Sequence, residues 1–135
     1  MNWKRILMAT IIVYIVYEVI NFIVHGVILS GAYQTMADTW RTDMQSKMWV
    51  MYIGDIIFAL FFVVIFAKGY EGKGLMEGIR YGLLMSGFVI IPGMLAQYSV
   101  YEVTFVLTLQ WIVFGFIKLI IIGMITALIY KPQEL

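Results

Sequence analysis

Residues 104–130 form the sequence TFVLTLQWIVFGFIKLIIIGMITALIY, in which Lys118 is the only charged side chain. About 20 residues in a helix are enough to cross the hydrocarbon core of a bilayer. Backbone polar groups inside that core must be hydrogen-bonded within the protein, and a helix satisfies them within the segment itself. The stretch therefore predicts a transmembrane helix.

Three further apolar stretches, residues 6–30, 48–67 and 79–100, precede it. None shows the alternation over about ten residues that is typical of membrane barrel strands. We therefore expect an all-α integral membrane four-helix bundle, with helices at about 6–30, 48–67, 79–100 and 104–130. No linker, low-complexity tract or long repeat interrupts the chain, so residues 1–135 are expected to form a single transmembrane domain.

The composition excludes several classes of protein. Hydrophobic residues make up 63% of the 135 residues and charged residues 13%, against about 45–50% and about 25% in soluble domains. The net charge is +1 and the basic residues are scattered, so no surface for nucleic acid is expected. The absence of cysteine excludes disulfides and thiol chemistry. The partner that the composition predicts is the lipid bilayer.

The basic residues are distributed unevenly between the two ends of the predicted bundle. If both termini are cytoplasmic, Arg41 and Lys47 lie on the outer side. The inner side then holds Lys4, Arg5, Lys68, Lys73, Arg80 and Lys131. Cytoplasmic loops carry the excess of Lys and Arg. We therefore expect a protein of the inner (plasma) membrane with both termini in the cytoplasm.

The connections between helices carry two further patterns. Residues 31–47 place apolar side chains at helical spacing, which predicts either a short interfacial helix or an irregular loop. On the third helix, small residues recur at every fourth position, a spacing that lets another helix approach closely. These predicted helix-packing residues are Gly74, Gly78, Gly82 and Ser86. Pro92 lacks a backbone donor and predicts a kink in the same helix.

Ionisable side chains inside the apolar stretches are the candidate functional residues, because each charge at the bilayer centre costs about 2.5–3.5 kcal/mol on insertion scales. On the first helix they follow steps of four, three and four residues and share one stripe. The predicted buried polar cluster consists of Tyr14, Glu18, Asn21 and His25 from that stripe, Tyr52 and Asp55 from the second helix, and Lys118 from the fourth.

The depths of these residues predict an ion pair. At 1.5 Å per residue, Glu18 and Lys118 both lie about 18–20 Å from the outer end. We therefore predict that Glu18 pairs with Lys118 and that Asp55 is a second candidate anion for the same ammonium. Two acids and one base leave either a net negative charge or a shared proton.

Several roles remain open for this cluster. The pair can fix the register of the helices, or Glu18, Asp55 and His25 can form a relay for protons or cations from the outer face to the middle of the membrane. No cofactor is required, although His25 offers one axial ligand for haem, and Glu18, Asp55 and His25 are acceptable metal ligands. No catalytic residue is predicted, because Ser86 lacks a paired base. A membrane enzyme would need a cavity beside His25, Asp55 and Tyr52.

Two resemblances accompany this interpretation. Residues 21–29 (NFIVHGVIL), followed by Tyr33 and Trp40–Arg41, and residues 67–82 (AKGYEGKGLMEGIRYG) resemble an uncharacterised family of small bacterial four-helix inner-membrane proteins. The resemblance covers most of the chain and implies topology and setting without catalytic roles. Glu18 on the first of four short helices is also similar to the membrane-embedded glutamate of small multidrug-resistance transporters, from which the long first loop, Asp55 and Lys118 depart.

Two functions of different classes follow. The first is a non-catalytic accessory or structural subunit that packs against other membrane subunits or against its own copies. The second is a small proton-coupled transporter or ion pathway that uses Glu18, Asp55 and His25. Lys118 discriminates between them, because an ion pair with Glu18 would occupy the carboxylate that proton-coupled transport has to leave available.

Overall fold

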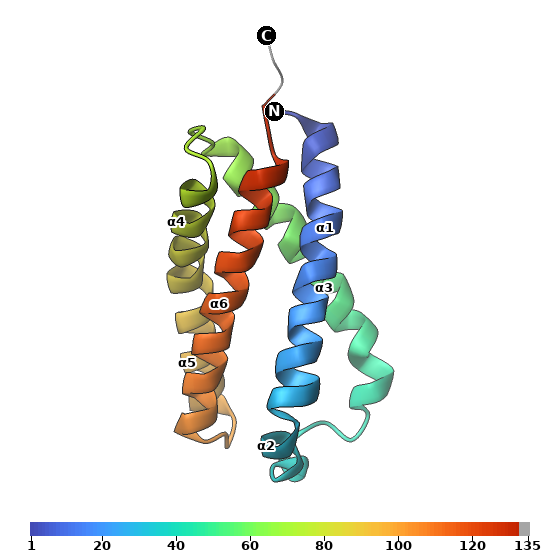
Figure 1. Ribbon diagram of the computed structural model, residues 1–135. Helices are drawn as coiled ribbons and strands as arrows, with labels where there is room; N and C mark the ends of the chain where they lie inside the picture. The colour runs from blue at the N-terminus through green and yellow to red at the C-terminus, as the bar shows by residue number, and fades with distance from the viewer. Residues whose placement is uncertain (133–135) are drawn as a thin grey trace.

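The computed structural model describes residues 1–132, which form four long, packed helical spans (Figure 1). The spans are α1 (Trp3–Asn21) with the π-helix η1 (Phe22–Ile28), α3 (Met44–Lys68), α4 (Leu75–Met85) with the π-helix η3 (Ser86–Ile90) and α5 (Ile91–Val100), and α6 (Phe105–Ile129). Each is long and apolar enough to cross a membrane. The chain is therefore an all-α integral membrane protein with four spans.

The connection between the first two spans contains short helical structure rather than one continuous surface helix. It consists of α2 (Ser30–Gln34), which directly follows the first span, and the 3-10 turn η2 (Ala37–Thr39). The chain then becomes extended at Trp40, whose ψ angle is 154°. This connection lies at the end of the bundle opposite the N-terminus and the last described residues (Figure 1).

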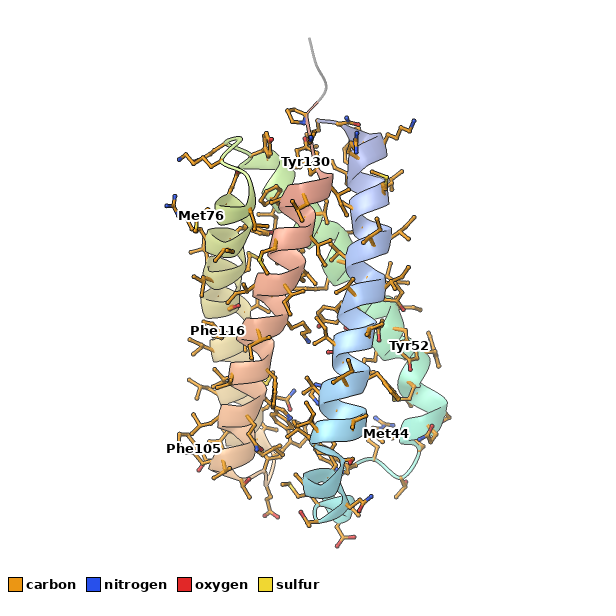
Figure 2. All side chains as sticks on the ribbon, viewed as in Figure 1. Met44, Tyr52, Met76, Phe105, Phe116 and Tyr130 are labelled. Carbon is orange, nitrogen blue, oxygen red and sulfur yellow. The ribbon has the colours of Figure 1, made fainter. Side chains whose placement is uncertain are left out.

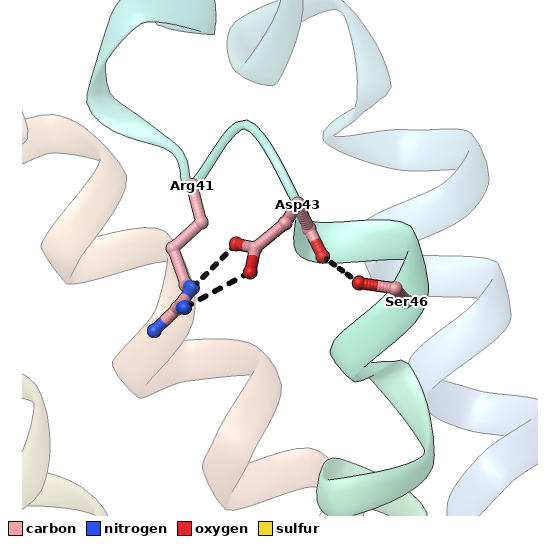
Figure 3. Close-up of polar contacts among 3 residues, drawn as sticks. All are labelled: Arg41, Asp43 and Ser46. Carbon is pink, nitrogen blue, oxygen red and sulfur yellow. Dashed lines mark hydrogen bonds and ion pairs between the residues drawn. The ribbon is translucent and has the colours of Figure 1, made fainter.

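An ion pair at the surface precedes α3 (Figure 3). The Arg41 guanidinium donates two hydrogen bonds to Asp43, from Nε to Oδ1 (2.9 Å) and from Nη2 to Oδ2 (3.1 Å). The Ser46 hydroxyl donates to the Asp43 carbonyl oxygen at 2.8 Å. Asp43 immediately precedes Met44, the first residue of α3.

Arg41→Gln is expected to raise the pKa of the Asp43 carboxyl, because hydrogen bonds from Arg41 lower that pKa below its ordinary value. The pair therefore stabilises the fold above the ordinary carboxyl pKa, and this contribution is lost as pH falls through the lowered value. A carboxyl-carbon NMR titration measures the midpoint. Lys47→Gln should leave it unchanged, and an unmoved midpoint in Arg41→Gln would contradict the prediction.

The turn between α3 and α4 is closed by a carboxylate. Glu77, in the first turn of α4, accepts hydrogen bonds from the backbone N–H groups of Glu71 (2.6 Å) and Lys73 (2.8 Å). Gly72 and Gly74 have φ angles of +76° and +68°, which glycine adopts without steric cost. Of the predicted helix-packing residues, Gly74 is therefore a turn residue, and a Cβ built on it would meet no atom within 4 Å.

The other three predicted packing residues lie where α4 and η3 meet α6. A Cβ on Gly82 would lie 2.5 Å from the Leu119 carbonyl oxygen, and one on Gly78 would lie 2.8 Å from the Gly123 carbonyl carbon. Ser86 is fully buried and donates a hydrogen bond of 2.7 Å to the Gly82 carbonyl oxygen. The two backbones therefore approach too closely for any side chain at Gly78 or Gly82.

The core is divided into two clusters. The larger lies toward the termini and joins α1, α3, α4 and α6 around Phe62, Leu119 and Ile122. The smaller lies toward α2 and is centred on Val24, Leu29, Val103 and Leu107. On the first span and on α6, Asn21 and Lys118 lie in sequence between residues of the two clusters.

α3 packs along α1 for only part of its length. Its first half diverges from α6 (Figure 1), and Met44 and Tyr52 lie on this divergent part (Figure 2). The apolar residues of this half are exposed: Met44, Trp49, Val50, Met51, Tyr52, Ile53, Ile56 and Ile57. Its second half, from Ala59 onward, supplies buried residues to the larger core cluster. The divergence leaves space between α3 and the other spans at the α2 end.

Candidate functional site

A cavity of about 380 Å³ occupies the α2 end of the bundle. Its walls come from the first span, α3, η3, α5 and α6, and Trp40 of the loop also lines it. Most of the lining is apolar or aromatic, including Val24, Met94, Trp111 and Phe114. Its polar side chains are Asn21, His25, Gln97 and Lys118. Mostly apolar walls with a few convergent polar groups are typical of small-molecule sites.

Lys118 is the only charged side chain that lines the described cavity, apart from any charge on His25. Its ammonium donates a hydrogen bond to Asn21 Oδ1 at 2.8 Å and lies 4.0 Å from the centre of the Tyr17 ring. Both contacts come from α1 and neither neutralises the charge. The ammonium has three N–H donors, so donors remain for a ligand in the cavity.

The predicted Glu18–Lys118 ion pair is wrong. Within residues 1–132, the two ion pairs present, Arg41–Asp43 and Glu71–Lys73, lie at the surface. The predicted buried charged cluster is absent as well, since Glu18, Asp55 and Lys118 are each only partly buried.

Helix rotation explains why the predicted pair does not form. Asn21 follows Glu18 by three residues, which places the two side chains roughly 60° apart around α1. Glu18 is therefore directed to α3 and Asn21 to α6. In the π-helix η1, hydrogen bonds span five residues and each residue turns through a smaller angle. His25 consequently follows Asn21 into the cavity, and the predicted stripe is divided between two neighbouring helices.

Glu18 and Asp55 lie at the interface of α1 and α3, close enough to interact electrostatically. Glu18 Oε1 and Asp55 Oδ2 are buried and have no hydrogen-bond partner among the described residues. Tyr14 and Tyr52 lie near these two carboxyl groups. We call Glu18 and Asp55 the carboxyl pair. A buried polar oxygen without a partner is costly, so this pair requires an explanation beyond packing.

An aromatic cluster borders the cavity near α2. The Tyr33 hydroxyl accepts a hydrogen bond from Trp111 Nε1 (2.7 Å) and is also hydrogen-bonded to His25 Nδ1. Trp40 packs edge-on against the Tyr33 ring and donates from Nε1 to the Tyr33 carbonyl oxygen at 3.3 Å. Burial raises the pKa of Tyr33, and the bond from Trp111 opposes that shift. These contacts fix one nitrogen of His25 and leave Nε2 as its remaining ligand atom.

The cavity brings together only part of the predicted cluster. Asn21, His25 and Lys118 line it, whereas Tyr14, Glu18, Tyr52 and Asp55 are outside its lining. Sequence reasoning did not assign a site role to Trp40, Met94, Gln97 or Trp111. The sequence pattern that could have identified them is the concentration of aromatic and amide side chains near one membrane face. Residues that anchor a helix at the lipid interface have the same pattern, so it does not distinguish a site.

Within residues 1–132, no group of three His, Asp or Glu side chains is placed to hold a metal ion. The enzyme interpretation needed His25, Asp55 and Tyr52 around one opening, and the cavity lining contains His25 without the other two.

The chain was compared with protein-family models, curated proteins and solved structures. None of the three comparisons found a match. The functional interpretation therefore rests on the chemistry of the cavity and the carboxyl pair.

Proposed function

We propose that the protein is a small proton-coupled membrane transporter in which the carboxyl pair exchanges a proton and the cavity holds the solute. One observation carries the proposal: Glu18 and Asp55 each have a buried oxygen without a partner, while Lys118 is hydrogen-bonded to Asn21. A structural ion pair between Glu18 and Lys118 would have occupied the Glu18 carboxylate permanently. Its absence leaves the carboxyl pair available for protonation.

The charge balance at the interface of α1 and α3 supports proton exchange. Two carboxylates held close together in a membrane cannot easily both ionise, so a proton is expected to be shared or exchanged there. The titratable groups that adjoin the pair are Tyr14 and Tyr17 of α1, Tyr52 of α3 and Lys118 of α6. Lys118 acts on the carboxyl pair through its field and also lines the cavity. It therefore links the proton site to the solute site.

The orientation follows from the loop charges. With both termini cytoplasmic, as the excess of Lys and Arg favours, the cavity at the α2 end lies on the outer side. His25, which lies beside the aromatic cluster at the border of the cavity, is then the titratable residue of the cavity lining that lies nearest the outer surface. Four spans barely enclose a cavity, so oligomers of the chain belong to this proposal.

Infrared pH titration of the reconstituted protein tests proton exchange. As the pH falls, we expect a carboxylic-acid band to appear when the carboxyl pair takes up a proton. Glu18→Gln and Asp55→Asn should each change this band, whereas the exposed Asp38→Asn should not. A band that is insensitive to both Glu18→Gln and Asp55→Asn would reject the proposal.

A second function, the non-catalytic accessory or structural subunit of a membrane complex, is favoured by a different observation. The first half of α3 diverges from the bundle and exposes apolar side chains around most of its circumference, including Trp49 at 59% exposure. Lipid or another protein has to cover them. Purification from the native membrane in mild detergent distinguishes the two, because a stable hetero-complex would support the subunit function.

A further inference from the structure

We infer that the cavity binds a small amphipathic organic anion, with its acidic group on the Lys118 ammonium and its apolar body between the aromatic walls. The inference deepens the proposed function by naming the class of solute. It is carried by the pairing of one cation with an apolar cavity that contains no carboxylate among its described lining residues. A cationic solute would meet the Lys118 charge, and no carboxylate among the described lining residues would contact it.

The position of Lys118 determines how the anion lies. Lys118 is near the middle of α6, and Phe114 and Trp111 follow it toward the α2 end. The bound acidic group therefore lies nearest the middle of α6, while the body occupies the part of the cavity lined by Met94 and Trp111. A phospholipid headgroup belongs at the membrane interface, so we favour a whole small molecule that enters from the aqueous side over an anionic lipid.

Gly115 lets Ile90 pack closely against α6 near the ammonium. It is buried on the cavity wall one turn from Lys118, and a Cβ at this position would lie 2.8 Å from Ile90 Cγ2. Asn21 holds the ammonium from the α1 side, leaving N–H donors for a carboxylate. Charge-assisted hydrogen bonds of this kind are stronger than neutral ones, particularly away from water.

The anion and the proton should bind cooperatively. An anion on Lys118 reduces the stabilisation that the ammonium gives to the nearby carboxyl pair, which favours proton uptake there. Linkage makes the effect reciprocal, so protonation of the pair strengthens anion binding. The inference therefore specifies transport of the anion together with a proton in the same direction.

Calorimetric titration of the full chain in nanodiscs tests the class of solute, with empty nanodiscs subtracted. The probes are phenylacetate, acetate, 2-phenylethanol and 2-phenylethylamine, which separate the acid from the apolar body. We expect phenylacetate to bind at least about tenfold more tightly than each of the others, since only it satisfies both Lys118 and the aromatic walls. Equal binding of the alcohol or the amine would overturn the inference.

Variants then locate the bound acid. Lys118→Met should reduce phenylacetate affinity by about tenfold or more, Lys118→Arg should retain most of it, and the matched exposed change Lys47→Met should leave it unchanged. Undiminished binding in Lys118→Met would overturn the inference. If that variant does not fold, the comparison of probes on the unaltered chain still decides. If phenylacetate does not bind but the infrared titration is positive, the anion is rejected and proton exchange is not. If phenylacetate binds but the infrared titration is negative, only the proposed function is rejected.

Discussion

Gly82→Ala is expected to lower the free energy of unfolding by about 2 kcal/mol. A Cβ at this position would lie 2.5 Å from the Leu119 carbonyl oxygen and 2.6 Å from Ile120 Cα, so the α4 and α6 backbones have to separate. Overpacking a well-packed interface costs about 3 kcal/mol at its upper range, and the better helix propensity of alanine returns about 1 kcal/mol. Unfolding in mixed detergent micelles, followed by circular dichroism, measures the difference.

The matched control for this prediction is Gly54→Ala on α3. Gly54 also lies inside a transmembrane helix, but a Cβ there would meet no atom within 4 Å. We expect Gly54→Ala to leave the stability unchanged or to raise it by up to about 1 kcal/mol. Equal effects of the two substitutions would mean that close approach of α4 and α6 does not determine stability.

Lys118→Met is expected to raise the free energy of unfolding by about 1 kcal/mol. Removing a charge from the middle of a span recovers about 2.5–3.5 kcal/mol on insertion scales. The lost bond to Asn21, the lost contact with the Tyr17 ring and the lost attraction to the carboxyl pair each offset about 0.5–1 kcal/mol. The same unfolding measurement in mixed micelles tests the sign of the change.

The sign separates two roles of Lys118. Breaking a buried ion pair costs about 3–5 kcal/mol, because an uncompensated charge is left behind, so a strongly destabilised Lys118→Met would contradict the contacts described for this residue. Lys47→Met makes the same chemical change at an exposed position and should stay within about 0.5 kcal/mol. A stabilising Lys118→Met that also loses anion binding would show that this charge is kept for function at the expense of stability.

The candidate site was only partly predictable from the sequence. Glu18, Asp55 and Lys118 stand out in the sequence because ionisable side chains are rare inside apolar stretches. Their pairing was not predictable from depth alone. A step of three residues directs Glu18 and Asn21 to different helices, and η1 changes the direction of His25 through hydrogen bonds that span five residues.

The sequence by itself determined the four spans and the close contact of Gly78 and Gly82 with a neighbouring helix, because both depend on short-range patterns of apolar and small residues. Tertiary structure alone decided that Lys118 bonds to Asn21 and that Glu18 and Asp55 lie close together, each with one buried oxygen without a partner among the described residues. It also decided that the first half of α3 diverges and leaves a cavity. The physical reason is that partner choice depends on the rotation and separation of whole helices, which no single segment encodes.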